Sequence, residues 1–198
     1  MGIIPYGEYN EAMKKPVLYI PMGLPGAGKS TYFKQMKDVV AVSGDGVREE
    51  LFGDEALQFS DAYLTEHGYD VSAMDEKQKF RICTKAVWDR VNARVASLLR
   101  EGRSAAYDGL NHRPRSRGEG IRLAKGIAVV HGILFAVDAE TCIQRDLARN
   151  RTVGEDVIRM FERQFVQPDM EEGFDILDVV DEDGMIIAHC VRDGFEAE

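Results

Sequence analysis

The residues with the clearest chemistry form a glycine-rich loop. The pattern G-x-x-x-x-G-K-S/T is filled at every position by the run from Gly23 to Thr31. Glycines let backbone N–H groups turn inward around a polyphosphate, Lys29 reaches the β and γ phosphates, and the Ser30 hydroxyl can hold Mg²⁺ at the following helix. The loop predicts binding of ATP or GTP through Gly23, Pro25, Gly26, Ala27, Gly28, Lys29, Ser30 and Thr31. A chance glycine-rich turn is the structural alternative.

A second pair of residues distinguishes a kinase from a simple ATPase. Asp45 and Arg48 are three residues apart at the start of an expected helix, so they project from the same face. The Asp45 carboxylate can accept the proton of an incoming hydroxyl while the Arg48 guanidinium grips a phosphate with two hydrogen bonds. The alternatives are a helix cap for Asp45 and a surface ion pair for Arg48.

Further polar residues follow other apolar runs. Asp108 ends a short expected strand, where it can hold the acceptor or orient Arg48, or simply cap a turn. Asp138 also follows an apolar run, and there we expect a helix cap. Arg149 and Arg151, with Arg145 before them, precede a hinge-like Val-Gly and suit a lid that closes on the transferred phosphoryl group. A solvent-facing basic helix is the alternative for all three.

The expected elements would bring these residues to one edge of a sheet. Apolar runs predict strands over 17–20, 39–43, 104–107 and 127–137, and a strand pair over 176–180 and 185–191 around a tight turn. Helices are expected over 29–37, 44–52, 75–100, 118–125, 139–150 and 155–165, with Asp54 to Ser72 irregular. Phe80 and Cys83 begin the apolar face of the long helix. Alternating strands and helices predict an α/β sandwich with a mainly parallel sheet and the nucleotide at the carboxyl ends of the strands.

Length and composition narrow the setting. The 198 residues suit one domain, with no room for a second enzymatic domain. No apolar run is long enough to cross a membrane, and the three cysteines suit buried, reduced thiols in the cytoplasm. A net charge of −9 disfavours broad adhesion to nucleic acid, although a basic patch from His112 to Lys125 can override it locally. A solvated loop and helix face is an equal alternative for that patch.

These residues resemble the polynucleotide-kinase-like branch of P-loop kinases. The resemblance rests on Gly-Leu-Pro-Gly-Ala-Gly-Lys-Ser-Thr, on Val-Ser-Gly-Asp-Gly-Val-Arg around Asp45, on Tyr-Asp-Gly-Leu-Asn ending at Asn111 and followed by Arg117, and on Arg149-Asn150-Arg151. It spans about residues 17–180. It implies a single P-loop NTPase domain over 1–198, with a core of about 17–180 and a helical lid of about 139–165.

The resemblance also implies roles for individual residues. ATP and Mg²⁺ would lie on Lys29 and Ser30, and the catalytic set would be Lys29, Asp45, Arg149 and Arg151. The acceptor would be bound by Arg48, Asp108, Asn111 and Arg117. Related branches phosphorylate sugar nucleotides, as zeta-type toxins do, or small alcohols, or modified DNA bases, and Gly109-Leu110 departs from the small or hydroxyl residues common there.

The sequence therefore predicts an ATP-dependent phosphotransferase acting on an alcohol, foremost the 5′-hydroxyl of a nucleic acid or nucleotide. A small-molecule kinase is the second enzymatic possibility. A nucleotide-dependent switch or binding module is the third, and the Asp45–Arg48 pair argues against it because a switch needs no acceptor base.

Overall fold

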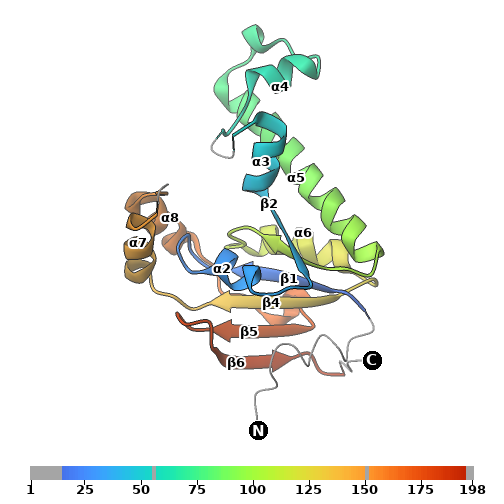
Figure 1. Cartoon of the computed structure of the whole chain (residues 1–198), viewed down its shortest axis with the longest axis vertical. Helices are drawn as coiled ribbons and strands as arrows, with labels where there is room; N and C mark the ends of the chain where they lie inside the picture. The colour runs from blue at the N-terminus through green and yellow to red at the C-terminus, as the bar shows by residue number, and fades with distance from the viewer. Residues whose placement is uncertain (1–14, 55–56, 150–151, 195–198) are drawn as a thin grey trace.

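The apolar runs of the sequence form a central sheet in the computed structural model, which describes residues 15–54, 57–149 and 152–194 (Figure 1). The sheet has six strands in the order β2-β3-β1-β4-β5-β6. Neighbouring strands are parallel from β2 to β5, and β6 is antiparallel to β5. The strands are β1 (Val17–Met22), β2 (Val39–Ser43), β3 (Ser104–Asp108), β4 (Val129–Phe135), β5 (Ile176–Val180) and β6 (Ile186–Val191).

Helices cover both faces of the sheet. They are α2 (Lys29–Lys34), α3 (Gly44–Phe52), α4 (Asp61–Glu66), α5 (Glu76–Arg100), α6 (Pro114–Ala124), α7 (Ala139–Leu147) and α8 (Glu155–Gln164), with the 3₁₀ turns η1 (Val71–Ala73) and η2 (Met170–Glu172). This is the expected P-loop NTPase-like α/β architecture, and the β5–β6 pair is the expected hairpin. Among the described helices, none is both long and apolar enough to cross a membrane.

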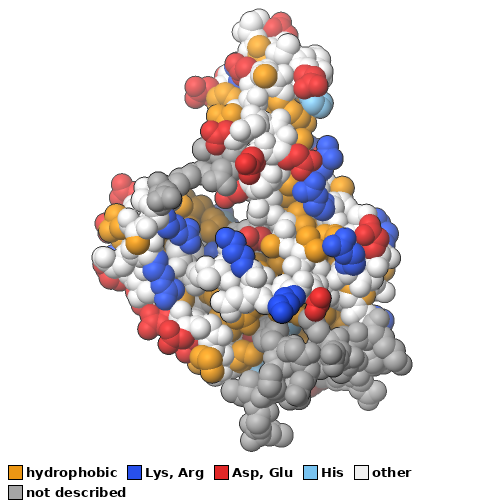
Figure 2. Space-filling view, in the orientation of Figure 1, with side chains coloured by type: hydrophobic (Ala, Val, Ile, Leu, Met, Phe, Trp, Pro, Cys, Tyr) orange, Lys and Arg blue, Asp and Glu red, His pale blue; other side chains and the backbone are white. Residues whose placement is uncertain are grey.

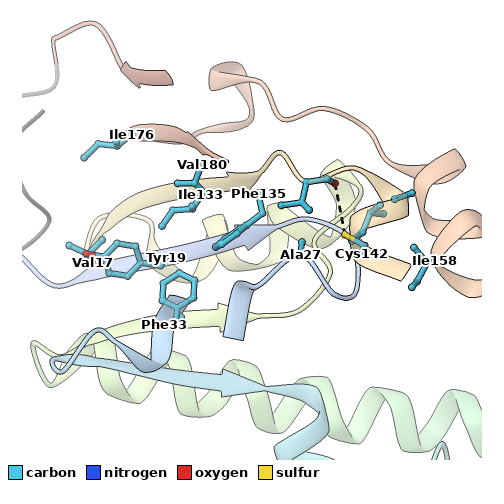
Figure 3. Packing of buried hydrophobic residues seen from close by; sticks show 14 of the residues in the cluster. Val17, Tyr19, Ala27, Phe33, Ile133, Phe135, Cys142, Ile158, Ile176 and Val180 are labelled. Carbon is cyan, nitrogen blue, oxygen red and sulfur yellow. Dashed lines mark hydrogen bonds between the residues drawn. The ribbon is translucent and has the colours of Figure 1, made fainter. Parts of the chain in front are cut away.

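The central strand β1 is buried on both faces, and its alternating side chains belong to two cores. Tyr19 packs with Phe33 of α2 and Ile133 of β4, and the Tyr19 and Phe33 ring centroids are 5.7 Å apart (Figure 3). Leu18 and Ile20 lie in the other core, with residues of α5 and α6. Since both faces are covered, β1 holds the loop that follows it on a rigid base.

Several expected boundaries change for local reasons. The 54–72 segment contains α4 and η1, which are too short to show periodicity; the Ser60 hydroxyl caps α4 by accepting from the Tyr63 N–H. Helix α6 begins at Pro114 rather than near Gly118, since proline is well tolerated in the first turn of a helix. The helix after the loop ends at Lys34, short of the expected residue 37.

Two side chains expected to be buried are exposed. Phe80 is 44% exposed because the first turns of α5 extend beyond the sheet, beside α3 and α4 (Figure 1). Cys190 is exposed on the edge strand β6, while Cys83 and Cys142 are buried as expected. Asp138 caps α7, as predicted, by accepting from the Thr141 N–H at 2.8 Å. The boundaries of the core and the lid stay predictions.

Candidate functional site

The phosphate-binding loop connects β1 to α2, and its glycines make the conformation possible. Gly26 and Gly28 have φ angles of 89° and 95°, in the left-handed region that favours glycine. A Cβ on Gly26 would lie 2.5 Å from the carbonyl oxygen of Cys142, so only glycine lets the loop approach α7 this closely. The loop backbone can thus turn its N–H groups toward a phosphate. Its Gly26 also packs directly against α7.

The Lys29 ammonium lies over this loop. It donates hydrogen bonds of 2.8 Å to the carbonyl oxygens of Gly23 and Leu24. Burial lowers the pKa of Lys29 to about 8, while the nearby Asp108 carboxylate acts to raise it and Arg149 to lower it. A cation that is poorly solvated and held by carbonyls is well placed to bind an anion that reaches the loop.

Asp108 ends β3 and faces the start of α2. Its carboxylate accepts a 3.3 Å hydrogen bond from the Ser30 hydroxyl. Burial raises the pKa of Asp108, Lys29 and Ser30 lower it, and the Asp45 carboxylate raises it. The structure therefore brings Lys29, Ser30 and Asp108 together, with Asp45 within electrostatic range.

Asp45 and Arg48 lie on the first turns of α3, directly after β2. The Ser43 hydroxyl caps this helix by accepting from the Gly46 N–H at 3.0 Å. The Arg48 guanidinium donates to the Asp45 carboxylate at 2.6 Å. The Asp45 side chain is 63% exposed and the Arg48 side chain 16%, so the carboxylate is open to a substrate while the arginine holds its orientation.

A hollow of about 410 Å³ lies beside the loop. Residues 26–28 of the loop, Tyr32 of α2 and the 181–184 turn between β5 and β6 line it, together with Arg145 and Arg149 of the α7 end. The structure thus brings Arg149 to the phosphate loop, whereas Arg145 donates to the carbonyl oxygen of Glu182. Arg151 lies outside the described residues.

The structure gives Asn111 and Arg117 buried positions rather than open ones. The Asn111 amide donates to the carbonyl oxygens of Pro21 and Tyr107 at 2.8 and 3.0 Å, and its own φ is 46°. The Arg117 guanidinium is fully buried and makes two hydrogen bonds to Glu172, at 2.7 and 2.6 Å. Both residues fasten the segment after β3 to its neighbours, so any effect of theirs on an acceptor would be indirect.

Two arginines of the basic patch expected from residue 112 to 125 are paired with acids. Arg117 donates to Glu172 and Arg122 to Glu119, whereas Arg113 donates to the neutral side chain of Gln164. On the face drawn in Figure 2, acidic side chains are frequent on the projecting end, and the body carries basic and acidic side chains together.

Asp146 is a positioning residue that the sequence did not single out. It is 1% exposed, and its carboxylate accepts from the backbone N–H groups of Val153 and Gly154, just before α8. An acid in the last turn of a helix is unfavourable for the helix dipole, which is the one sequence signal that marks it. Asp146 thus fixes the start of α8 relative to α7.

Oxygen ligands for a cation are present at the loop. Mg²⁺ prefers a few protein oxygens together with substrate phosphates, and the Ser30 hydroxyl and the Asp108 carboxylate offer oxygens of this kind at the start of α2. Within the described ranges, no group of three or more His, Cys, Asp or Glu residues forms a metal site by itself. The donor set therefore fits Mg²⁺ held jointly with a nucleotide.

A family model described as an AAA domain matches residues 18–168. The comparison with curated proteins returned no match.

Solved structures share the fold at low sequence identity. A chain of the Pnkp1/Rnl/Hen1 RNA repair complex is 22% identical with a TM-score of 0.57, over 76% of this chain and 44% of that one. A chain from the PezAT toxin–antitoxin system of Streptococcus pneumoniae is 17% identical with a TM-score of 0.57, over 94% and 81%. The AvrRxo1-ORF1:AvrRxo1-ORF2 structure matches at 17% identity and a TM-score of 0.55, over 97% and 63%. The chain thus spans less than half the length of the first of these.

Proposed function

The chain belongs to the AAA domain family, and we propose that it is an ATP-dependent kinase that transfers the γ-phosphate to an alcohol. The observation that carries the proposal is the Asp45–Arg48 pair on α3, which faces the carboxyl edge of the sheet together with Lys29 and Asp108. Binding and hydrolysis of ATP alone need no second carboxylate beside an arginine. Transfer to a hydroxyl uses both.

The nucleotide would bind along the loop and the hollow beside it. Backbone N–H groups of residues 26–28 would hold the β-phosphate, and the Lys29 ammonium would exchange its two carbonyl partners for phosphate oxygens. When bound, Mg²⁺ neutralises charge on the β and γ phosphates, and Ser30 and Asp108 are the residues that would hold it. Arg149, at the rim of the same hollow, would stabilise the charge that spreads over the transferred group.

The acceptor would bind on the α3 side. Its hydroxyl gives its proton to the Asp45 carboxylate as the oxygen forms a bond to the γ-phosphorus. The bond from that phosphorus to the β–γ bridging oxygen breaks, and ADP leaves with the electron pair. Arg48 keeps Asp45 in place and offers its remaining N–H groups to a phosphate on the acceptor.

We propose that this acceptor is the 5′-hydroxyl of a nucleotide or nucleic acid. Arg48 provides a guanidinium for a phosphate adjacent to the reacting sugar, and one structure of similar fold belongs to an RNA repair complex. The test is a screen of γ-labelled ATP against 5′-hydroxyl oligonucleotides, nucleosides, sugar nucleotides and small alcohols, with the product identified by mass. Labelled oligonucleotide or nucleotide supports the proposal, and label only in a sugar nucleotide or small alcohol overturns it.

A comparison of two acceptors tests the role of Arg48 directly. Adenosine 3′-monophosphate carries the phosphate that Arg48 would grip, and adenosine lacks it. The wild-type protein should prefer the former, and Arg48→Ala should raise its KM by about 10- to 100-fold, the scale of charge-assisted hydrogen bonds. Arg48→Lys should recover part of this preference because it keeps the charge and loses the planar fork. Equal use of both acceptors, with both variants unaffected, would favour a neutral small-molecule alcohol.

A further inference from the structure

A second, larger pocket lies between α5 and α6, next to the acceptor side of the site. Its volume is about 630 Å³, within the range of pockets that hold small ligands. Trp88 and Asn92 of α5, Tyr107 of β3 and Ser116 and Glu119 of α6 line its walls. None of these residues has a part in the phosphoryl transfer described above.

Trp88 connects this pocket to the catalytic edge of the sheet. A Cβ on Gly44, the first residue of α3, would lie 3.7 Å from the indole, and one on Gly109, which follows Asp108, would lie 3.3 Å from it. The indole edge therefore sits between the residues that precede Asp45 and follow Asp108. A side chain at Gly109 would press on the ring, so the glycine leaves room for the indole at this place.

The aromatic wall is fixed before any ligand arrives. The Trp88 and Tyr107 rings are 5.6 Å apart between centroids. The Tyr107 hydroxyl donates to the Asn92 side chain at 3.0 Å, and the Asn92 amide donates to Glu119 at 3.2 Å. Burial raises the pKa of Tyr107, so its hydroxyl stays protonated as a donor. A rigid aromatic wall costs a ligand little ordering entropy.

Two arginines at the rim of the pocket have no acidic partner among the described residues. Lys85 pairs with Asp89 at 2.5 Å, whereas Arg113 donates to the neutral side chain of Gln164 and keeps its charge. Arg115 is exposed at the rim and makes no ion pair within the described part of the chain. The pocket thus combines an aromatic wall with cations at its opening, a combination that suits a planar ring bearing a phosphate.

We infer that this pocket binds the base of a nucleoside phosphate acceptor, with the ring stacked on Trp88. The inference rests on the proposed kinase function and names its substrate class. An aliphatic alcohol or a sugar acid has no planar ring to place against this wall. A base held here would lie beside Asp45, so its sugar would be carried to the reacting edge.

Fluorescence provides a binding test that does not depend on turnover, because Trp88 is the only tryptophan of the chain. The full chain would be titrated with adenosine 3′-monophosphate and, separately, with ribose 3-phosphate, which has the same phosphate and no base. Saturable quenching by the former, at concentrations where the latter gives none, is the expected result. Equal responses to the two probes, or no response to either, overturn the inference.

Kinetics with two variants tests the same contact in the reaction. Trp88→Leu should raise the KM for adenosine 3′-monophosphate by about 5- to 100-fold with a small change in kcat, the scale of base–aromatic stacking, and Trp88→Phe should have a smaller effect. Phe80→Leu is the matched control, an exposed aromatic residue on the same helix, and should leave KM unchanged. Thermal melting identifies a variant that fails to fold; Trp88→Phe then carries the test. An unchanged KM in the folded variants overturns the inference.

The same assays separate this inference from the proposed function. If the wild-type protein phosphorylates no alcohol of the screen, the kinase proposal fails, whatever the fluorescence shows. If it phosphorylates an alcohol and the Trp88 variants behave as wild type, only the pocket assignment fails. A 5′-hydroxyl pentanucleotide, compared with the mononucleotide, then identifies the source of the ligand: a much lower KM for the pentanucleotide indicates a strand end, and similar values indicate a free nucleotide.

Discussion

The phosphate loop and the 108–117 segment both follow parallel strands and lie side by side, yet they use their residues in opposite ways. The Gly23 N–H and the Leu110 carbonyl oxygen, 3.4 Å apart, join them directly. In the loop, the backbone provides most of the binding groups, and Lys29 adds one charge. In the 108–117 segment the backbone is ordinary apart from Asn111, and the side chains of Asn111, Arg113 and Arg117 each have a hydrogen-bond partner.

Polar residues at this edge of the sheet therefore have two roles: some face the proposed reacting groups, and others form buried structural contacts. Asp108 faces Ser30 and lies within electrostatic range of Lys29, so we place it on the proposed reacting edge. Arg117, nine residues later, is fully buried on Glu172. The phosphate loop would bind through backbone groups, so we expect substitutions of its glycines to be poorly tolerated. In the 108–117 segment the side chains make the contacts, so one residue can contact the substrate while another is buried in the core. Variants of each kind test this division.

The largest expected effect belongs to the loop. Lys29→Ala should lower phosphoryl transfer by about 10³-fold or more, because the ammonium compensates charge that builds up in the transition state. The fold should remain, since the loop backbone is shaped by its glycines. Lys34→Ala, on the same helix and exposed, is the control and should keep full activity. Full activity in folded Lys29→Ala would remove the phosphate-loop hypothesis.

A substitution on the acceptor side should lower turnover without affecting ATP binding. Asp45→Asn should lower kcat by roughly 10²- to 10⁴-fold and leave ATP binding unchanged, because the amide keeps the shape of the carboxylate and cannot take the proton. Glu49→Gln, one turn later on α3 and exposed, should have no effect. Equal losses of ATP affinity and turnover in Asp45→Asn would place Asp45 on the nucleotide instead of the acceptor.

The same division explains what could be predicted from the sequence. The loop was recognised because its chemistry is encoded in consecutive glycines and one lysine, and the strands and long helices follow from apolar spacing. Arg117 and Asn111 were assigned to the acceptor because nothing local distinguishes a substrate arginine from one that pairs with Glu172, 55 residues away. Nothing local in the sequence marks Trp88 as lining a pocket, since its neighbours Gly44 and Gly109 meet it only through the fold.

Arg117 should therefore affect stability rather than acceptor binding. Arg117→Met leaves the Glu172 carboxylate without its cation and should lower the free energy of unfolding by about 3–5 kcal/mol. Arg122→Met is a close control, because it breaks an exposed Arg–Glu pair on the same helix and should cost less than about 1 kcal/mol. Denaturant unfolding measures both. Unchanged stability with a raised acceptor KM in Arg117→Met would restore Arg117 to the acceptor site.

The smallest expected effect is a gain in stability on replacing Lys29, the residue for which we expect the largest loss of activity. Burial lowers the pKa of Lys29 from 10.5 to about 8, so the native protein holds this charge at a cost. Below about pH 8 the lysine is protonated in both the native and the unfolded chain, and the whole cost is present. Between about pH 8 and 10.5 only the unfolded chain keeps the proton, so the free energy of unfolding of the wild type rises with pH.

Lys29→Met removes this cost together with the hydrogen bonds to Gly23 and Leu24. Because the two effects oppose each other, the variant should be more stable than the wild type by about 1–2 kcal/mol at pH 7. That advantage should shrink as the pH rises from 8 to 10.5, since the wild type alone gains stability there. Denaturant unfolding of both proteins across this range gives the difference. A constant difference would mean that the ammonium is well solvated in the native loop, and the contrast with Arg117, whose charge is fully paired, would then disappear.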